Sequence, residues 1–325
     1  MSGSAETGKV GGFLTDEGRE RFLAAYDRAM RCWPEPRAGR EIGTRFGATY
    51  VHVYNEEAGG IPLVLLHGAN STSAAWSRCI AAFGADRPVY AVDTVGDAGR
   101  SVQTAPLRGP EDLSEWLDEV LDEVLDGRAQ TRVHLVGMSY GGWIALVHAT
   151  RTARRLASVT ALDPPRALAP LKPSFLLGAI AAAVSGSDRR RRRFLGTLMG
   201  PEGSEGSEGS ETTGGGTNEG QESEAYEGQM DLMLAAMRHF RPGTPHPQKI
   251  DDEPLRSLSV PVLVLLAELS AVHAARRAQT RATALLPAAT AWTETVPGAR
   301  HVLPADVLSD LLPRFHAEVD AADGP

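Results

Sequence analysis

One serine stands in a context that favours nucleophilic chemistry. Residues 137–141 read Gly-Met-Ser-Tyr-Gly, between an apolar strand-like run, RVHLVG, and a segment with helical spacing. A serine at such a turn is held at positive φ, and its glycine neighbours let strand and helix approach closely. The Oγ atom of Ser139 would then stand clear of the backbone, and the N–H group of Tyr140 could stabilise a developing oxyanion. The pattern alone also fits an ordinary glycine-rich turn, so the surrounding motifs must decide.

Two further motifs supply groups that a serine nucleophile needs. The run LLHGAN, which ends at Asn70, closes another candidate strand with a His-Gly turn. Such a turn can offer a second oxyanion N–H group, here from Ala69. The run VPGARH places His301 in a loop after the last candidate strand, where it can act as a general base. The sequence therefore predicts acyl-transfer chemistry.

The elements that must position these groups alternate along the chain. Candidate strands begin at residues 41, 48, 61, 88, 132, 156, 261 and 290, and helical segments such as EDLSEWLDEVLDEVLD separate several of them. Strands that are apolar throughout and alternate with helices indicate a mostly parallel, doubly wound sheet. The first two strands are nearly contiguous and are expected to form an antiparallel hairpin at one edge. The prediction is an α/β fold with about eight strands.

The alternation breaks between Pro164 and Glu253. We predict that residues 13–165 and 251–325 form the core and that 166–250 form an inserted helical cap, with helices near 175–185, 190–199 and 230–240. Within the cap, the acidic tract 200–228 is rich in Gly, Ser and Glu and is expected to be disordered, as are residues 1–12. Five consecutive arginines, 189–193, are interpreted as a solvated helix start that pairs with this tract.

The composition excludes several function classes. A formal net charge of −8 makes a nucleic-acid partner unexpected. Cys32 and Cys79 form neither a disulfide framework nor a metal motif, and no phosphate-binding glycine pattern follows the first strand. The first dozen residues lack the features of a signal peptide, and the apolar run from Phe175 to Val184 is shorter than the roughly 20 residues that span a bilayer. We therefore expect a cytoplasmic protein without cofactor, metal or membrane contact, which acts on a small molecule and could form a homo-oligomer.

The motifs together resemble the α/β-hydrolase superfamily, and in particular a small bacterial esterase-like branch with a cap after the sixth strand. The matching pieces cover roughly residues 67–301, and they are HGANSTSAAW, VYAVDTVGDAGRS, GMSYGG, LDPP, VPVLVLLAELS and VPGARH. The resemblance implies Ser139 as nucleophile and His301 as general base. It also implies an oxyanion hole from the N–H groups of Tyr140 and Ala69, with Asn70 in the same binding loop.

One position departs from the family pattern. The seventh main strand of the family usually ends in G-E-x-D, whose last acid orients the histidine, but this chain reads Ala-Glu-Leu-Ser and has Ser270 there. Three alternatives follow. Glu268 could act as a displaced acid on the same side of an extended chain, Asp163 could serve from the end of the sixth strand, or the site could be a serine–histidine dyad with a weak hydrogen bond from Ser270. We place Glu268 slightly ahead of Asp163.

The expected function is serine-dependent hydrolysis of an ester or thioester of a hydrophobic small molecule. The alternative is a non-hydrolytic enzyme of the same fold, namely a cyclase, lyase or epimerase of a bacterial specialised-metabolite pathway. A ligand receptor that has lost turnover fits less well, because the sequence retains Ser139, His301 and both oxyanion turns.

Overall fold

A computed structural model describes residues 9–200 and 218–323 of the chain. Within these residues a nine-stranded sheet has the spatial order β11-β10-β8-β7-β4-β5-β3-β2, with β6 paired to β3. Its strands are β2 (Arg37–Thr44), β3 (Gly47–Tyr54), β4 (Leu63–Leu66), β5 (Val89–Val92), β6 (Val102–Gln103), β7 (Val133–Met138), β8 (Leu156–Leu162), β10 (Val262–Ala267) and β11 (Ala291–Val296).

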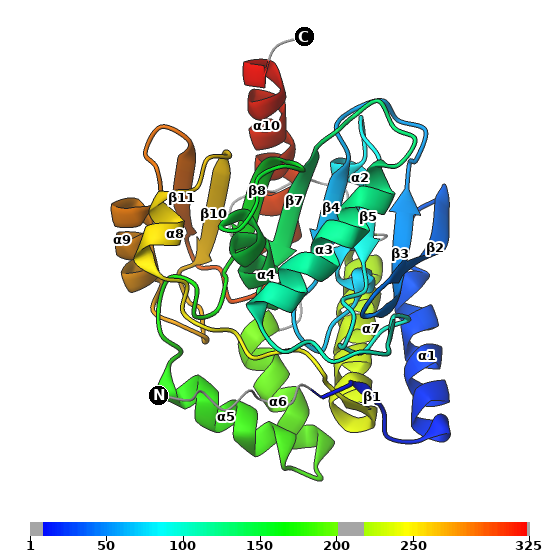
Figure 1. Cartoon of the computed structure of the whole chain (residues 1–325). Coiled ribbons are helices and arrows are strands. Elements are labelled where there is room, and N and C mark those ends of the chain that lie inside the picture. Colours follow the sequence, from blue (N-terminus) through cyan, green and yellow to red (C-terminus); the bar gives the residue numbers. More distant parts are fainter. Residues whose placement is uncertain (1–8, 201–217, 324–325) are drawn as a thin grey trace.

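The strands from β11 to β5 run parallel, whereas β3 is antiparallel to both β5 and β2. The predicted parallel sheet with an antiparallel hairpin at one edge is therefore confirmed (Figure 1). Every residue of β4, β7, β8 and β10 is buried. This explains why these segments read as continuous apolar runs rather than alternating ones.

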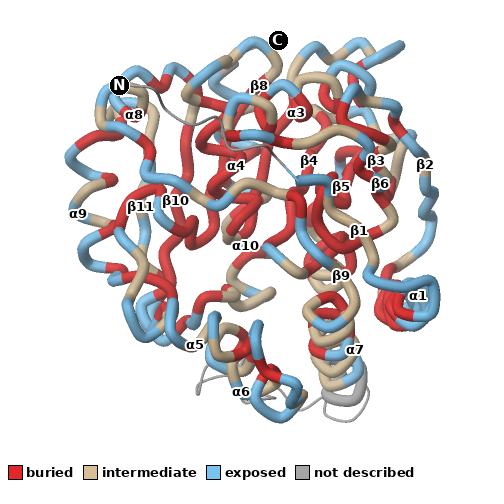
Figure 2. The backbone as a smooth tube through the Cα atoms, turned by 60° about the horizontal axis from the view of Figure 1, so that its bottom comes forward, coloured by how far each residue is buried: buried red, intermediate tan, exposed pale blue. Residues whose placement is uncertain are grey.

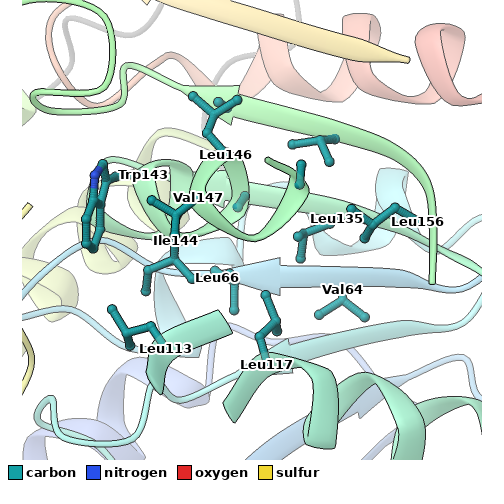
Figure 3. Close-up of a cluster of buried hydrophobic side chains, with 14 of the residues drawn as sticks. Val64, Leu66, Leu113, Leu117, Leu135, Trp143, Ile144, Leu146, Val147 and Leu156 are labelled. Atoms are coloured by element: carbon teal, nitrogen blue, oxygen red, sulfur yellow. The ribbon is translucent and has the colours of Figure 1, made fainter. Parts of the chain in front are cut away.

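Helices cover both faces of the sheet. They are α1 (Asp16–Met30), α2 (Ile80–Phe83), α3 (Pro110–Leu125), α4 (Tyr140–Ala149), α8 (Asp252–Arg256), α9 (Ala275–Leu285) and α10 (Ala305–Asp323), together with a short 3-10 turn at Ser73–Trp76. Alternate residues of β4 serve opposite faces, because successive strand side chains point in opposite directions. Val64 and Leu66 join the cluster under α3 and α4 (Figure 3), whereas Leu63 and Leu65 pack with residues of α1, α2 and α10.

The cap follows β8 and comprises α5 (Pro173–Ala183), α6 (Asp188–Met199) and α7 (Asn218–His239). A small apolar cluster that includes Met199 and Met230 holds α6 against α7. Figure 2 shows that α5 and α6 are mainly exposed or half-buried, in contrast to the strands behind them. The N-terminal segment contacts the cap, since α1 packs beside α7 and β1 (Gly12–Phe13) pairs with β9 (Phe240–Arg241).

The tract expected to be disordered, 200–228, differs in part from that expectation. Residues 201–217 lie outside the described residues, as do residues 1–8, but 218–228 form the first half of α7. Two residues at the end of this half contact other elements: Gly228 lies against Ala29 of α1, and Glu227 accepts hydrogen bonds of 2.8 and 2.9 Å from Arg192. Tertiary contacts thus order residues whose composition alone favours disorder. The ion pair also agrees with the predicted pairing between the arginine run and the acidic tract.

In the described parts of the chain, no helix combines the length and the apolar character needed to cross a bilayer.

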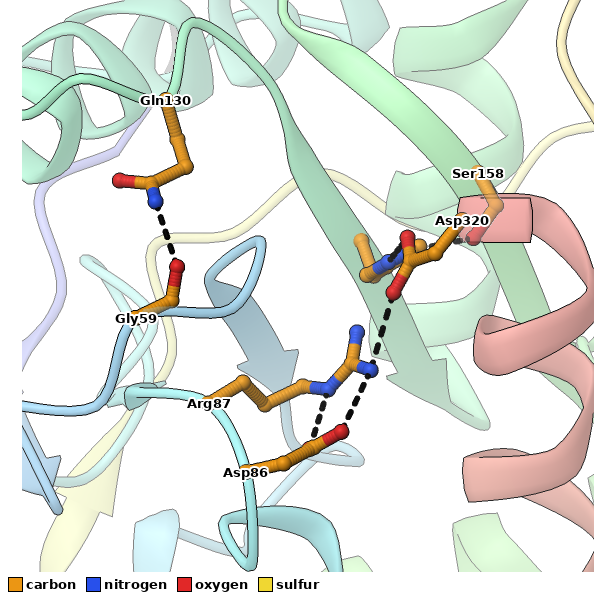
Figure 4. Close-up of polar contacts among 7 residues, drawn as sticks. Gly59, Asp86, Arg87, Gln130, Ser158 and Asp320 are labelled. Carbon is orange, nitrogen blue, oxygen red and sulfur yellow. Dashed lines mark hydrogen bonds and ion pairs between the residues drawn. The ribbon is translucent and has the colours of Figure 1, made fainter. Parts of the chain in front are cut away.

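A polar cluster fastens α10 to the sheet (Figure 4). The carboxylate of Asp320 accepts a hydrogen bond of 3.0 Å from the buried Arg87 guanidinium and lies 3.0 Å from Nε2 of His134. The other ring nitrogen of His134 lies 2.7 Å from the Ser158 hydroxyl. Burial by itself would raise the pKa of Asp320, but His134 and Arg87 outweigh burial and lower it. Asp320 is therefore ionised at neutral pH and links α10 to β7 and to the turn before β5.

We expect Asp320→Asn to lower the free energy of unfolding by about 1–2 kcal/mol, because the buried Arg87 loses one charged partner. The matched control is Asp310→Asn on the same helix, whose carboxylate pairs with the exposed Arg314. An exposed pair contributes about 0.5 kcal/mol or less. Urea denaturation at pH 7 measures both, and equal midpoints for the two variants would contradict the proposed anchoring role.

Candidate active site

Ser139 stands at the junction of β7 and α4 in a conformation that side chains rarely adopt, with φ 52° and ψ −115°. The two glycines of the motif make this junction possible. A Cβ atom at Gly137 would lie 2.1 Å from the carbonyl oxygen of Gly141, and one at Gly141 would lie 2.3 Å from that of Leu66. Neither position can hold a larger residue without moving backbone. The sequence pattern therefore reflects close approach of β7, α4 and β4.

His301 lies between Ser139 and Asp163. Its Nε2 is 2.7 Å from the Oγ of Ser139, and its Nδ1 is 2.5 Å from Oδ2 of Asp163. An ionised carboxylate accepts hydrogen bonds only, so the proton of the neutral ring resides on Nδ1. Nε2 is then free to accept the serine proton. The three side chains form one continuous hydrogen-bonded chain.

Asp163 follows directly after β8, which lies between β7 and β10 in the sheet. The carboxyl ends of neighbouring parallel strands meet at one edge, so the end of β8 faces both Ser139 and the loop after β11. The side chain is completely buried, and its Oδ1 and Oδ2 accept hydrogen bonds from the Ala267 N–H and the Ser270 hydroxyl, at 3.1 and 2.6 Å. Burial would raise the pKa of Asp163, but contacts with His273 and His301 hold it well below its usual range.

Glu268, which sequence reasoning placed slightly ahead as the acid, lies elsewhere. Its side chain is exposed and accepts a 2.8 Å hydrogen bond from the N–H of Gly298, in the loop that leads to His301. The expectation assumed an extended chain from Glu268 to Ser270. Strand β10 instead ends at Ala267, and the N–H of Ser270 turns back to the Ala267 carbonyl at 3.1 Å. The geometry therefore favours Asp163 over Glu268.

Ser270 stands where the family pattern has its acid, and it lies beside Asp163. It does not make the hydrogen bond to the histidine that the dyad alternative requires. Its hydroxyl donates to Asp163 rather than to His301. His273, which also contacts the carboxylate, was not singled out from the sequence. The only available signal was a histidine shortly after the seventh main strand.

The predicted oxyanion loop lies against the serine. A Cβ atom at Gly68 would be 3.3 Å from Cβ of Ser139. His67 fixes this loop, since its Nε2 accepts from the Thr94 N–H at 3.0 Å and its Nδ1 lies 2.8 Å from the Gly68 carbonyl. The N–H of Asn70 is already used, because it donates to the buried Asp97 at 3.0 Å. This leaves the N–H group of Ala69 as the candidate oxyanion donor of the loop beside Ser139.

Tyr140, the second predicted oxyanion residue, begins α4 directly after the serine. Its side chain bonds to the segment after the cap, because the hydroxyl donates to the Pro245 carbonyl at 2.7 Å. Trp143, one turn later, donates to the Gln248 carbonyl at 2.8 Å. Helix α4 thereby holds the segment that returns from the cap to the core.

A cavity of about 60 Å³ lies between the core and the cap next to these groups. The core contributes Trp76, together with Met138 before Ser139 and Val302 after His301. The cap contributes Met199, Tyr226 and Gln229. A larger hollow of about 530 Å³ lies at the β11 edge, between α9 and α10, and contains none of the residues discussed for the site. Within residues 9–200 and 218–323 no cluster of three or more metal-ligating side chains is present.

The strained backbone at Ser139 has a measurable consequence. Ser139→Ala and Ser139→Gly both remove the hydroxyl, but only glycine adopts positive φ without strain. We expect the glycine variant to be more stable than the alanine variant by about 1 kcal/mol, whereas glycine is less stable than alanine in ordinary helices and strands. Thermal and urea unfolding of the two variants test this, and an alanine variant as stable as the glycine variant would contradict it.

Comparisons with known proteins agree with this architecture. Residues 63–310 match the profile of the alpha/beta hydrolase family. Carboxylesterase YbfK of Bacillus subtilis (strain 168) is 28% identical over 291 residues, which cover 90% of each chain. The uncharacterized carboxylesterase nap of the same organism is 27% identical over 310 residues, 94% of this chain and 95% of the relative. The crystal structure of naproxen esterase (carboxylesterase NP) from Bacillus subtilis superposes with a TM-score of 0.73 at 26% identity, over 96% of this chain and 99% of that one. This chain belongs to the α/β-hydrolase family.

Proposed function

We propose that this protein is a carboxylesterase that cleaves a carboxylic ester through a covalent acyl-enzyme at Ser139. The observation that carries the proposal is the hydrogen-bonded chain from the serine hydroxyl through His301 to Asp163, with distances of 2.7 and 2.5 Å. The names of the two Bacillus relatives, both carboxylesterases, support the same reaction class.

The first half of the reaction forms the acyl-enzyme. The Oγ atom of Ser139 attacks the ester carbonyl carbon while Nε2 of His301 takes its proton. The N–H groups of Tyr140 and Ala69 stabilise the resulting oxyanion, and one such donor typically contributes 10²- to 10³-fold to the rate, or roughly 3–4 kcal/mol. The bond to the leaving oxygen then breaks, and Nε2 returns the proton to the departing alcohol.

The second half releases the acid. A water molecule gives a proton to His301 as its oxygen attacks the acyl carbon, and collapse of the second tetrahedral intermediate frees Ser139 with its proton restored. In both halves a positive imidazolium forms beside Asp163. Because this carboxylate is buried and ionised, it stabilises that charge at both stages.

The cavity beside the site limits what the substrate can present there. A space of about 60 Å³ with apolar walls from Trp76, Met138 and Met199 suits a compact apolar group of the ester. A thioester could react at the same carbonyl position. The cap contributes Met199 and Tyr226 to this wall, so the cap helps to select the substrate.

The central test is covalent labelling combined with turnover. We expect a fluorophosphonate probe to add one adduct to the folded protein, located on Ser139 by peptide mass spectrometry and absent from Ser139→Ala. Short p-nitrophenyl esters should be hydrolysed by the wild type and not by the variant. An unlabelled Ser139 would reject the nucleophile, and labelling without turnover of esters or thioesters would favour the non-hydrolytic alternative.

The identity of the acid is tested by a matched pair of variants. We expect Asp163→Asn to lower kcat by up to about 10⁴, the loss typical when the orienting acid of a triad is neutralised. Glu268→Gln should remain close to the wild type, because the exposed Glu268 side chain is hydrogen-bonded to the loop before His301 and not to the histidine itself. Circular dichroism and melting temperature control for folding. The opposite ranking of the two variants would return the role to Glu268.

A further inference from the structure

A second histidine contacts the carboxylate of Asp163. Nε2 of His273 lies 3.1 Å from Oδ1 of Asp163, and both side chains are completely buried. The contact is close but poorly aligned for a hydrogen bond, and Nδ1 of His273 has no hydrogen-bond partner among the described residues. A bare ring nitrogen facing a carboxylate would be repelled, so the proton belongs on Nε2. His273 therefore offers Asp163 an N–H dipole.

Each carboxylate oxygen of Asp163 has two close polar contacts. Oδ2 receives His301 at 2.5 Å and the Ser270 hydroxyl at 2.6 Å. Oδ1 accepts a hydrogen bond from the Ala267 N–H and lies in close contact with Nε2 of His273, both at 3.1 Å. The carboxylate can rotate about its Cβ–Cγ bond only if both pairs of contacts change. Partners on Oδ1 thus fix the direction in which Oδ2 faces His301.

His273 is itself held in place from the cap side. Leu171 pairs with His273 in an antiparallel bridge, and the next residue, Lys172, donates its backbone N–H to the Val272 carbonyl at 2.8 Å. The ammonium group of Lys172 donates to the Ser270 carbonyl at 2.5 Å. The segment 270–273 is therefore clamped at the point where α5 begins.

We propose that His273 is a positioning residue of the esterase reaction, which holds Oδ1 of Asp163 so that Oδ2 stays aligned with Nδ1 of His301. The inference rests on the proposed function, because it assigns His273 to the acid of that site. It acts through Asp163 and contacts neither substrate nor the serine.

This role predicts effects that a merely space-filling histidine would not have. Loss of the N–H dipole leaves the Asp163 carboxylate less satisfied, so it attracts the proton of His301 more strongly and favours the charged imidazolium over the neutral base. The acid limb of the pH–rate profile is then expected at higher pH. Among the described residues, the charged and titratable groups facing this segment are Asp163, His301 and Lys172. The change in the pH profile should come through the first two.

The experiment compares His273→Phe, which fills the space without a donor, with His273→Gln, which keeps a donor. We expect the phenylalanine variant to lose about tenfold or more in kcat, with KM unchanged, and its acid limb of kcat/KM to move up by about half a pH unit. His273→Gln should recover most of both. The control is His148→Phe, at a fully buried histidine that pairs with Ser114 away from the site, and it should alter only the melting temperature.

Two results would overturn the proposal. One is a folded His273→Phe variant with wild-type kcat and acid limb. The other is equal loss in the phenylalanine and glutamine variants, which would assign the effect to ring shape. If His273→Phe does not fold, His273→Met carries the same prediction, because its unbranched chain adapts to the space.

A readout without turnover separates this inference from the proposed function. The Nδ1 proton of His301 in its short hydrogen bond to Asp163 can be followed by ¹H NMR at low temperature. We expect its resonance to move in His273→Phe, to return in His273→Gln and to be unchanged in His148→Phe. If the wild type cleaves no ester, the proposed function fails, and this comparison still decides the role of His273.

Discussion

The structure depends on one buried ionised carboxylate. Asp163 is withdrawn from water, and a charge in that position is tolerated only when several donors surround it. The donors come from the end of β10, from the segment that follows it and from the loop after β11. Each of these segments is therefore fixed relative to β8. The hydrogen bonds that the Asp163 carboxylate needs therefore hold the parts of the site in place.

The same requirement explains how the proposed acid, Asp163, can follow β8 although the family pattern places its acid after β10. The two strands are parallel neighbours, about 4.8 Å apart, and they end at the same edge of the sheet. A carboxylate that leaves either end can reach the same histidine. Ser270, at the usual acid position, contributes a hydroxyl donor to the relocated carboxylate. Glu268 is free to hold the backbone of the loop that carries His301.

The acid and the cap are connected through one short stretch of chain. Asp163 directly follows β8, and nine residues later the chain reaches Lys172, which precedes α5. Lys172 is hydrogen-bonded to the segment that carries Ser270 and His273. Across the site, Tyr140 and Trp143 of α4 hold the segment that returns from the cap. The geometry of the proposed site and the position of the cap thus depend on shared contacts, so we expect changes in cap sequence to alter turnover as well as substrate choice.

The sequence by itself determined the parallel sheet, its antiparallel edge hairpin, the turn at Ser139 and the loop of His301. These features are local: apolar runs make strands, and glycines at 137 and 141 fit a turn in which backbones nearly touch. Only the tertiary structure brought Asp163 rather than Glu268 against His301, placed His273 beside Asp163, and showed that residues 218–228 join a helix. Those outcomes depend on which strand ends meet and where β10 turns at Ala267. A linear sequence lists the polar groups at strand ends, but burial and distance decide which of them share a proton.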